Sequence, residues 1–220
     1  DLTLQPKVEA LVPGWADVAT WSGCWNAYSG FAWDLRAGKW RLYFGPSGGH
    51  SASTNNGLYD FPVLRMEWGV VIPPTPRETW PPGYTGDTTY VGSGSWTSGP
   101  TGVWYDEVPE DGRKPAPRHT YGAGAFLPWV GADGAYAMLC RRAWVADITT
   151  KTWAPPRAYL NNNDPSTFSS AENMATWVDE AAQRMYHCGT NLSASTEDRN
   201  FWWDGASTFG TDGYYTNGGY

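Results

Sequence analysis

The feature that most constrains this fold is a unit of short strands and turns that recurs along the chain. Aromatic residues keep the same spacing in different copies of the unit. The repeated spacings are nine residues from Tyr59 to Trp68 and from Trp144 to Trp153, and sixteen residues from Tyr43 to Tyr59 and from Tyr186 to Trp202. Self-similarity of this kind is typical of repeat proteins, in which neighbouring units bury a shared core.

The first unit occupies residues 26–68 and sets the order of the repeat. A turn at Arg36-Ala37-Gly38 separates its first two strands, since glycine tolerates the backbone angles of tight turns. A loop from Gly45 to Gly57 follows the second strand. The predicted strands are residues 28–34, 39–44 and 58–61, with a closing fourth strand at Met66-Glu67-Trp68.

Two further units repeat this order, in residues 116–154 and residues 165–210. Arg184-Met185-Tyr186 takes the place that Arg41-Leu42-Tyr43 has in the first unit. The third unit offers Phe209 where the other units have a closing Trp. The predicted strands are residues 121–127, 135–139, 143–147 and 149–153 in the second unit, and residues 174–177, 184–187 and 201–204 in the third.

Little of the chain is predicted to be helical. Residues 4–11 and 170–179 could form short helices, but neither has a sustained apolar stripe at 3.6-residue spacing. Residues 174–177 therefore carry both a helix and a strand interpretation. The 26 Gly and 17 Pro residues lie mostly in turn clusters that Trp, Tyr, Phe or Val flank. Many short strands joined by turns are expected, which places the chain in the all-β class.

Short motifs inside the units resemble those of a known family. They are Gly48-Gly49-His50 followed by Asn56-Gly57-Leu58-Tyr59, Pro117-Arg118-His119-Thr120-Tyr121, the closing Trp68, and the set Trp144, Asp147 and Trp153. The ordered set resembles the kelch family of β-propellers over residues 20–210, and its first two motifs resemble the kelch-type proteins of tailed bacteriophages and prophages. The resemblance implies a kelch-like β-propeller of four-stranded antiparallel blades, with aromatic side chains filling the space between blades.

The number of blades stays open. Propellers have about 4–8 blades, and three units are recognisable here. Residues 1–25 are interpreted as part of a closing blade and residues 211–220 as the start of a further segment. We expect the chain to be a piece of a longer propeller, and the alternatives are a small closed ring and completion by another chain.

An insertion at residues 69–115 separates the first two units. It is rich in Pro, Gly, Ser and Thr but also in aromatic residues, which a flexible linker would lack. Long loops inside compact domains usually serve a function. The insertion is therefore the predicted contact surface, and its candidate binding residues are Trp80, Tyr84, Tyr90, Trp96, Trp104 and Tyr105.

No catalytic residue, metal site or cofactor is predicted. His50 and His119 fall near the axial ends of adjacent units, but His187 aligns with Phe44, a core strand position, which argues against a three-histidine metal site. Nucleophile elbows, phosphate-binding loops and His-Glu metal motifs are absent from the sequence. The copper-radical oxidases share the kelch fold, but their ligand set has no counterpart in these residues.

The carboxylates, loops and cysteines receive structural interpretations. Asp34, Asp60 and Asp147 recur at strand ends, where aspartate commonly accepts hydrogen bonds from turn backbone. The oxygen-rich loops at residues 51–56 and 161–164 lack the regular acidic alternation of a tight calcium site. Three cysteines without a C-x-x-C spacing are expected to be small buried apolar residues: Cys24, Cys140 and Cys188.

The net charge and the hydropathy of the chain limit the kinds of partner that it is expected to bind. The net charge is −7 and no Lys/Arg stripe occurs, which disfavours nucleic acid. No apolar run of about 18 residues occurs, so no membrane span is expected. The phage resemblance implies a non-enzymatic virion protein of a tail, fibre or capsid-decorating type. Its expected partners are other assembly subunits or host-surface glycans, and homo-oligomerisation is an open possibility. The alternatives are a secreted, extracellular carbohydrate-active or oxidase-like propeller and a generic kelch scaffold.

Overall fold

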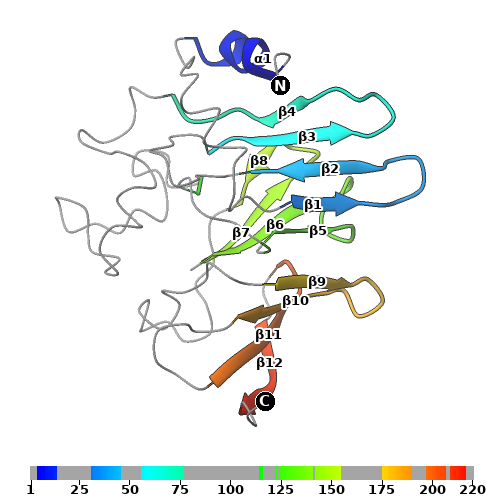
Figure 1. Cartoon of the computed structure of the whole chain (residues 1–220), viewed down its shortest axis with the longest axis vertical. Coiled ribbons are helices and arrows are strands. Elements are labelled where there is room, and N and C mark those ends of the chain that lie inside the picture. The colour runs from blue at the N-terminus through cyan, green and yellow to red at the C-terminus, as the bar shows by residue number, and fades with distance from the viewer. Residues whose placement is uncertain are drawn as a thin grey trace, which may run out of the picture. The chain divides into compact units, whose positions relative to one another are not determined.

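The computed structural model describes one helix and three antiparallel sheets (Figure 1). The chain divides into two compact units, residues 1–120 and residues 121–220. The described residues are 4–13, 31–45, 56–76, 114–115, 122, 124–140, 142–154, 175–189, 197–206 and 209–216.

The first unit contains one four-stranded sheet and the helix. The strand order is β1-β2-β3-β4, with each strand antiparallel to its neighbour. The elements are α1 (Leu4–Leu11), β1 (Phe31–Asp34), β2 (Arg41–Phe44), β3 (Leu58–Pro62) and β4 (Gly69–Ile72). We refer to these strands as the first sheet.

Helix α1 covers part of one face of the first sheet. Its apolar side chains Leu4 and Val8 are fully buried against Phe44 and Tyr59, because their four-residue spacing puts both on one side of the helix. The Lys7 ammonium donates to the Glu67 carboxylate and, at 2.8 Å, to the carbonyl oxygen of Trp68. The hydrogen bond and charge of Lys7 lower the pKa of Glu67. We call the apolar part of this contact the α1 cluster, formed by Leu4, Val8, Val12, Phe44, Tyr59, Trp68 and Val70.

The second unit contains two four-stranded sheets. The second sheet has the order β5-β6-β7-β8 and the third has the order β12-β11-β10-β9. The second sheet consists of β5 (Gly124–Leu127), β6 (Ala135–Cys140), β7 (Arg142–Asp147) and β8 (Thr152–Trp153). The third consists of β9 (Ala175–Asp179), β10 (Arg184–Gly189), β11 (Glu197–Trp203) and β12 (Phe209–Thr216).

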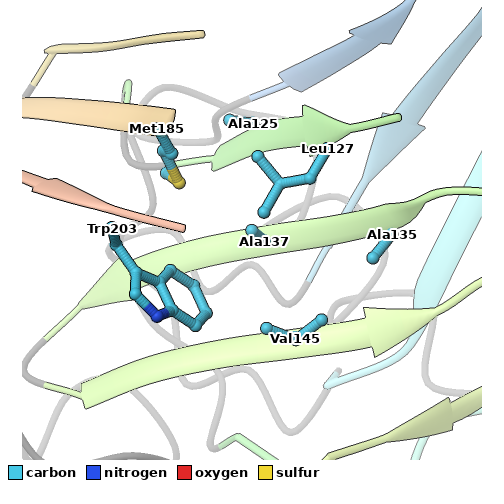
Figure 2. Close-up of a cluster of buried hydrophobic side chains, with 7 residues drawn as sticks. All are labelled: Ala125, Leu127, Ala135, Ala137, Val145, Met185 and Trp203. Atoms are coloured by element: carbon cyan, nitrogen blue, oxygen red, sulfur yellow. The ribbon is translucent and has the colours of Figure 1, made fainter. Parts of the chain in front are cut away.

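These two sheets pack against each other through an apolar core (Figure 2). Met185 and Trp203 of the third sheet are fully buried against a surface of small residues. Because alanine side chains project little from the backbone, the large side chains of the facing sheet can approach closely. We call this surface of the second sheet the alanine face, formed by Ala125, Leu127, Ala135, Ala137 and Val145.

Polar contacts fix the same two sheets at their edges. The indole nitrogen of Trp129 donates to the carbonyl oxygen of Asp204 at 2.9 Å. The Thr176 hydroxyl lies 2.6 Å and 2.9 Å from the carbonyl oxygens of Gly122 and Gly124. These hydrogen bonds are directional, so they set the relative position of two sheets that apolar packing alone would leave free to slide.

An identical turn joins the third and fourth strands of the first and second sheets. The Met66 amide donates to the Pro62 carbonyl at 3.1 Å, and the Lys151 amide donates to the Asp147 carbonyl at 2.9 Å. Met66 and Lys151 both have left-handed backbones, with φ of 51° and 56°. Because the turn is the same length in both sheets, the residues before and after it are separated by the same number of positions. This explains why nine residues separate Tyr59 from Trp68 and Trp144 from Trp153.

Most of the predicted strands are confirmed, as is the short helix at residues 4–11. The helix interpretation of residues 170–179 is wrong for its described part, because Ala175–Asp179 forms β9. The alternative strand interpretation holds, since Thr176 and Val178 face the second sheet while Trp177 faces away from it.

The fourth strands differ most from the prediction. In the first sheet Pro62–Met66 form a turn, and β4 begins at Gly69, within the predicted insertion rather than at Met66-Glu67-Trp68. In the third sheet β12 begins at the expected Phe209 but continues to Thr216, within the residues assigned to a further segment. Both sheets therefore complete four strands with residues that lie beyond their predicted bounds.

Candidate functional site

Several predicted residues lie outside the described part of the chain. This holds for all six aromatic residues proposed as binding residues: Trp80, Tyr84, Tyr90, Trp96, Trp104 and Tyr105. It also holds for His50, His119 and Cys24, and for residues 51–55 and 161–164. The backbone of Cys140 lies in β6, and the backbones of His187 and Cys188 lie in β10.

A surface that the sequence did not single out is present on the third sheet. Its face opposite the second sheet carries Trp177, Arg184, Tyr186 and Trp202, which we call the Trp177 face. Tyr186 pairs with Trp177 on one side and with Trp202 on the other. Paired residues of antiparallel strands point to the same side of a sheet, so the three aromatic residues form a row across β9, β10 and β11.

The side chains of the Trp177 face contact one another closely. The rings of Trp177 and Tyr186 are stacked, with centroids 5.2 Å apart and planes 4° apart. The Arg184 guanidinium carbon lies 3.9 Å from the centre of the Trp202 ring, a cation–π geometry. These contacts hold the aromatic rings in fixed orientations, so the rings lose little side-chain entropy when a partner binds here.

The Trp177 face is exposed at positions that are buried in the second sheet. Trp177 retains 48% of its accessible surface, and Arg184, Tyr186 and Trp202 are half-buried. When positions are counted from the turn between the first two strands of each sheet, the two sheets can be compared residue by residue. The row of the second sheet that matches Trp177, Tyr186 and Trp202 then consists of Ala125, Ala137 and Val145. Those three residues are buried beneath the third sheet. The Trp177 face is therefore the corresponding surface of the third sheet, without such a cover among the described residues.

The corresponding face of the first sheet is polar and largely buried, although the Arg41 side chain keeps 30% of its accessible surface. Arg41 and Tyr43 occupy the positions of Arg184 and Tyr186, and Tyr43 is only 2% exposed. Arg41 donates to the Asp60 carboxylate at 2.7 Å. Arg36 binds the Asp34 carboxylate through two nitrogens at 2.8 Å and 2.9 Å. Pairing of this kind is what allows charged groups to be buried at tolerable cost.

Burial of Tyr43 provides a measurable signature. Removal of the phenol from water raises the pKa of Tyr43 to about 12. The charge of Arg41 opposes this rise, and the charges of Asp34 and Asp60 add to it. A phenol whose pKa is higher in the folded state stabilises the fold fully below the unfolded value of about 10, and that contribution is lost as the pH rises through about 12.

We therefore expect the free energy of unfolding to fall more steeply with pH between 10 and 12 in the wild-type chain than in Tyr43→Phe. Urea unfolding at several pH values, followed by circular dichroism, measures the two slopes. Absorbance at alkaline pH should also show one tyrosinate fewer forming near pH 12 in the variant. Equal slopes in both chains would mean that Tyr43 ionises normally in the fold.

The strand-end aspartates have structural partners. The prediction of turn hydrogen bonding is confirmed for Asp34, which accepts from the Arg36 amide, and for Asp147, which accepts from the amides of Thr149 and Thr150 at 2.7 Å and 2.9 Å. The Asp60 carboxylate accepts a hydrogen bond from the Arg41 side chain on the neighbouring strand, so this aspartate also stabilises the pairing of β2 with β3.

A second exposed surface lies on the first sheet, on the face that α1 partly covers. Trp33 is 53% exposed, and Leu42 and Phe61 beside it are half-buried. The three residues are neighbours because Leu42 pairs with both Trp33 and Phe61. We call them the Trp33 face. Exposed contiguous aromatic and apolar side chains of this kind mark interaction sites on soluble proteins.

The described residues hold no cluster of three or more His, Cys, Asp or Glu side chains that could bind a metal ion. Within the same ranges, no helix is both long and apolar enough to cross a membrane. No family model, no curated protein and no solved structure matches the chain.

Proposed function

We propose that this chain is a non-enzymatic structural and binding protein whose Trp177 face is a contact surface. The observation that carries the proposal is the exposure of ordered aromatic side chains at positions that are covered in the second sheet. Tryptophan, tyrosine and arginine are the residues most enriched at the energetic centres of protein interfaces. The Trp177 face combines all three residue types on neighbouring strands.

We propose further that the sheets are blades of a kelch-like β-propeller. Three features support this fold: three four-stranded antiparallel sheets, a turn that recurs between the third and fourth strands of the first and second sheets, and face-to-face packing of the second and third sheets. The second, third and fourth strands of the second sheet also hold an aromatic cluster of the kind that fills the space between blades. Trp153 contacts Trp144 and Tyr136 edge-on, at centroid distances of 6.3 Å and 6.2 Å.

The proposed setting is a phage virion, in a tail, fibre or capsid-decorating position. This part of the proposal rests on the kelch-type motifs of the sequence, such as Gly48-Gly49-His50 and Pro117 to Tyr121. The partners would be other subunits of the particle or glycans of the host surface. A rigid sheet face that presents planar aromatic rings suits either partner, because such rings lose little entropy when they become buried.

Co-purification with particles tests this function. We expect a tagged chain, expressed in cells that produce the particle, to band with assembled particles in a density gradient. The double variant Trp177→Ser/Trp202→Ser should band at least about tenfold less, because two interface aromatics are lost. Trp40→Ser removes an equally exposed tryptophan outside the Trp177 face and should behave as the wild type. A wild-type chain found only free in the cytosol would contradict the virion role.

A further inference from the structure

We infer that one end of the first sheet binds the surface of an anionic lipid bilayer. The β1–β2 and β3–β4 turns lie together at this end, at the right of Figure 1. The Val63 amide of one turn donates to the Trp40 carbonyl of the other at 3.0 Å, so the two turns form one surface. We call this surface the turn tip, and its exposed apolar residues are Leu35, Trp40, Leu64 and Met66.

The apolar side chains of the turn tip are well exposed. Each of the four keeps more than half of its accessible surface, and Leu64 keeps 79%. A single exposed leucine on a protein surface is ordinary. A group of large apolar side chains on two touching turns is different, because such groups mark sites of contact with a protein or a membrane.

The β3–β4 turn does not need its apolar side chains. The β7–β8 turn of the second sheet has the same closing hydrogen bond and the same left-handed residue. Thr149 and Lys151 occupy the positions of Leu64 and Met66 there, and both are exposed. Since the same backbone forms with polar side chains, the fold does not account for the apolar ones.

The β1–β2 turn shows the same contrast with the β9–β10 turn of the third sheet. The two turns differ in length, but both end on an exposed left-handed residue, Trp40 with a φ of 34° and Gln183 with a φ of 52°. Their first residues are Leu35 and Glu180, which are also exposed. All four apolar residues of the turn tip therefore have polar counterparts in another sheet.

Cations outnumber acids at the turn tip, although the whole chain has a net charge of −7. The charged residues of the two turns are Arg36, Lys39, Arg65 and Glu67. The acid is bound by Lys7 of α1, and Arg36 is bound by Asp34. The exposed Lys39 and Arg65 therefore give this end of the sheet a positive charge, which complements a negatively charged partner.

The residue types favour a bilayer over a protein as that partner. Leucine is under-represented at the energetic centres of protein interfaces, yet two of the four apolar residues are leucines. Tryptophan is enriched at the membrane–water interface, and lysine and arginine close to a membrane are attracted to anionic head groups. Apolar side chains that enter the boundary between head groups and acyl chains strengthen binding in proportion to the apolar area that they bury.

Co-sedimentation with lipid vesicles tests the inference. We expect the wild-type chain to bind vesicles of phosphatidylcholine mixed with anionic phosphatidylglycerol more tightly than vesicles of phosphatidylcholine alone. Leu64→Thr/Met66→Gln should weaken binding to the mixed vesicles by about tenfold or more, because it removes apolar surface at constant charge. Arg65→Thr should weaken it by about fivefold, because one cation near the anionic surface is lost.

Two controls accompany these variants. Lys151→Gln removes one cation from the same turn of the second sheet and should bind the mixed vesicles as the wild type does. Leu64→Thr/Met66→Gln should unfold in urea at the wild-type concentration, because both side chains are exposed and glutamine already adopts a left-handed backbone at Gln183. A marked loss of stability would mean that another segment of the chain covers the turn tip, and the inference would then be wrong.

The vesicle results can also overturn the inference directly. A wild-type chain that binds neither kind of vesicle, or binds both equally well, would refute an anionic bilayer as the partner. Undiminished binding of Leu64→Thr/Met66→Gln would show that the turn tip is not the contact.

The inference goes beyond the proposed function, because the turn tip and the Trp177 face are different surfaces. Trp40→Ser should bind the mixed vesicles less tightly than the wild type and still band with particles. The double variant Trp177→Ser/Trp202→Ser should behave in the opposite way. If Trp40→Ser lost particle association and kept vesicle binding, the turn tip would be a protein contact and the lipid inference would fail.

Discussion

Replacing Trp203 with alanine is expected to lower the free energy of unfolding by about 3–5 kcal/mol. Trp203 has no exposed surface and lies in the core between the second and third sheets, beside Met185 (Figure 2). Removing the indole loses its apolar burial and leaves a cavity between two sheets. The Thr176 hydroxyl and the Trp129 indole donate to backbone carbonyl oxygens of the facing sheet and hold the two sheets in place, so the cavity cannot close easily.

Urea unfolding followed by circular dichroism measures this loss. The matched control is Trp40→Ala, which removes the same side chain from a position that is 54% exposed. Exposed substitutions away from special contacts usually change stability by about 0.5 kcal/mol or less. Similar losses in the two variants would show that Trp203 does not occupy a packed core, and the sheet-on-sheet contact would then be wrong.

The contrast between Trp202 and Trp203 shows how far sequence reasoning reaches. The run from Phe201 to Asp204 predicts a strand correctly, because aromatic residues favour strands and turns bound the segment. Which tryptophan faces the neighbouring sheet depends on the pairing register. A shift of one residue would exchange the two faces. Trp203 pairs with Met185 and is buried, whereas Trp202 pairs with Tyr186 and lies on the Trp177 face.

The same reasoning explains why the Trp177 face was not predicted. The repeat of Arg41-Leu42-Tyr43 as Arg184-Met185-Tyr186 was visible in the sequence. What could not be seen is that Tyr43 is buried while Tyr186 is half-exposed, because burial depends on what covers each sheet. A signal was nevertheless present in the sequence. Aligned positions hold Ala125 and Ala137 in one unit but Trp177 and Tyr186 in another.

Strand ends were harder to predict than strand existence. Trp68 closes the first unit by spacing, but the turn from Pro62 to Met66 uses the residues before it, so β4 begins only at Gly69. Turn geometry of this kind depends on a left-handed Met66, which its residue type does not suggest. Residues 175–179 were ambiguous because a short apolar run fits a strand or a helix turn.

Replacing Gly45 with alanine is expected to lower the free energy of unfolding by about 3 kcal/mol or more. Gly45 follows β2 and has a φ of 142°, a backbone conformation that is essentially restricted to glycine. An added Cβ would overlap the carbonyl oxygen of Gly57 and lie 3.0 Å from the Cα of Leu58. Both neighbours are backbone atoms at the start of β3, so they cannot rotate away as a side chain could.

Gly38→Ala separates backbone strain from this steric overlap. Gly38 lies in the β1–β2 turn with a φ of 75°, and an added Cβ there would meet no atom within 4 Å. Its substitution should therefore cost only the left-handed strain of about 1 kcal/mol. Because both glycines flank β2 in the same sheet, urea unfolding of the two variants isolates the close approach of β2 and β3. If Gly45→Ala were no more destabilising than Gly38→Ala, Gly45 and Gly57 would have to lie further apart than the structure places them, and the register that pairs Phe44 with Tyr59 would lose its support.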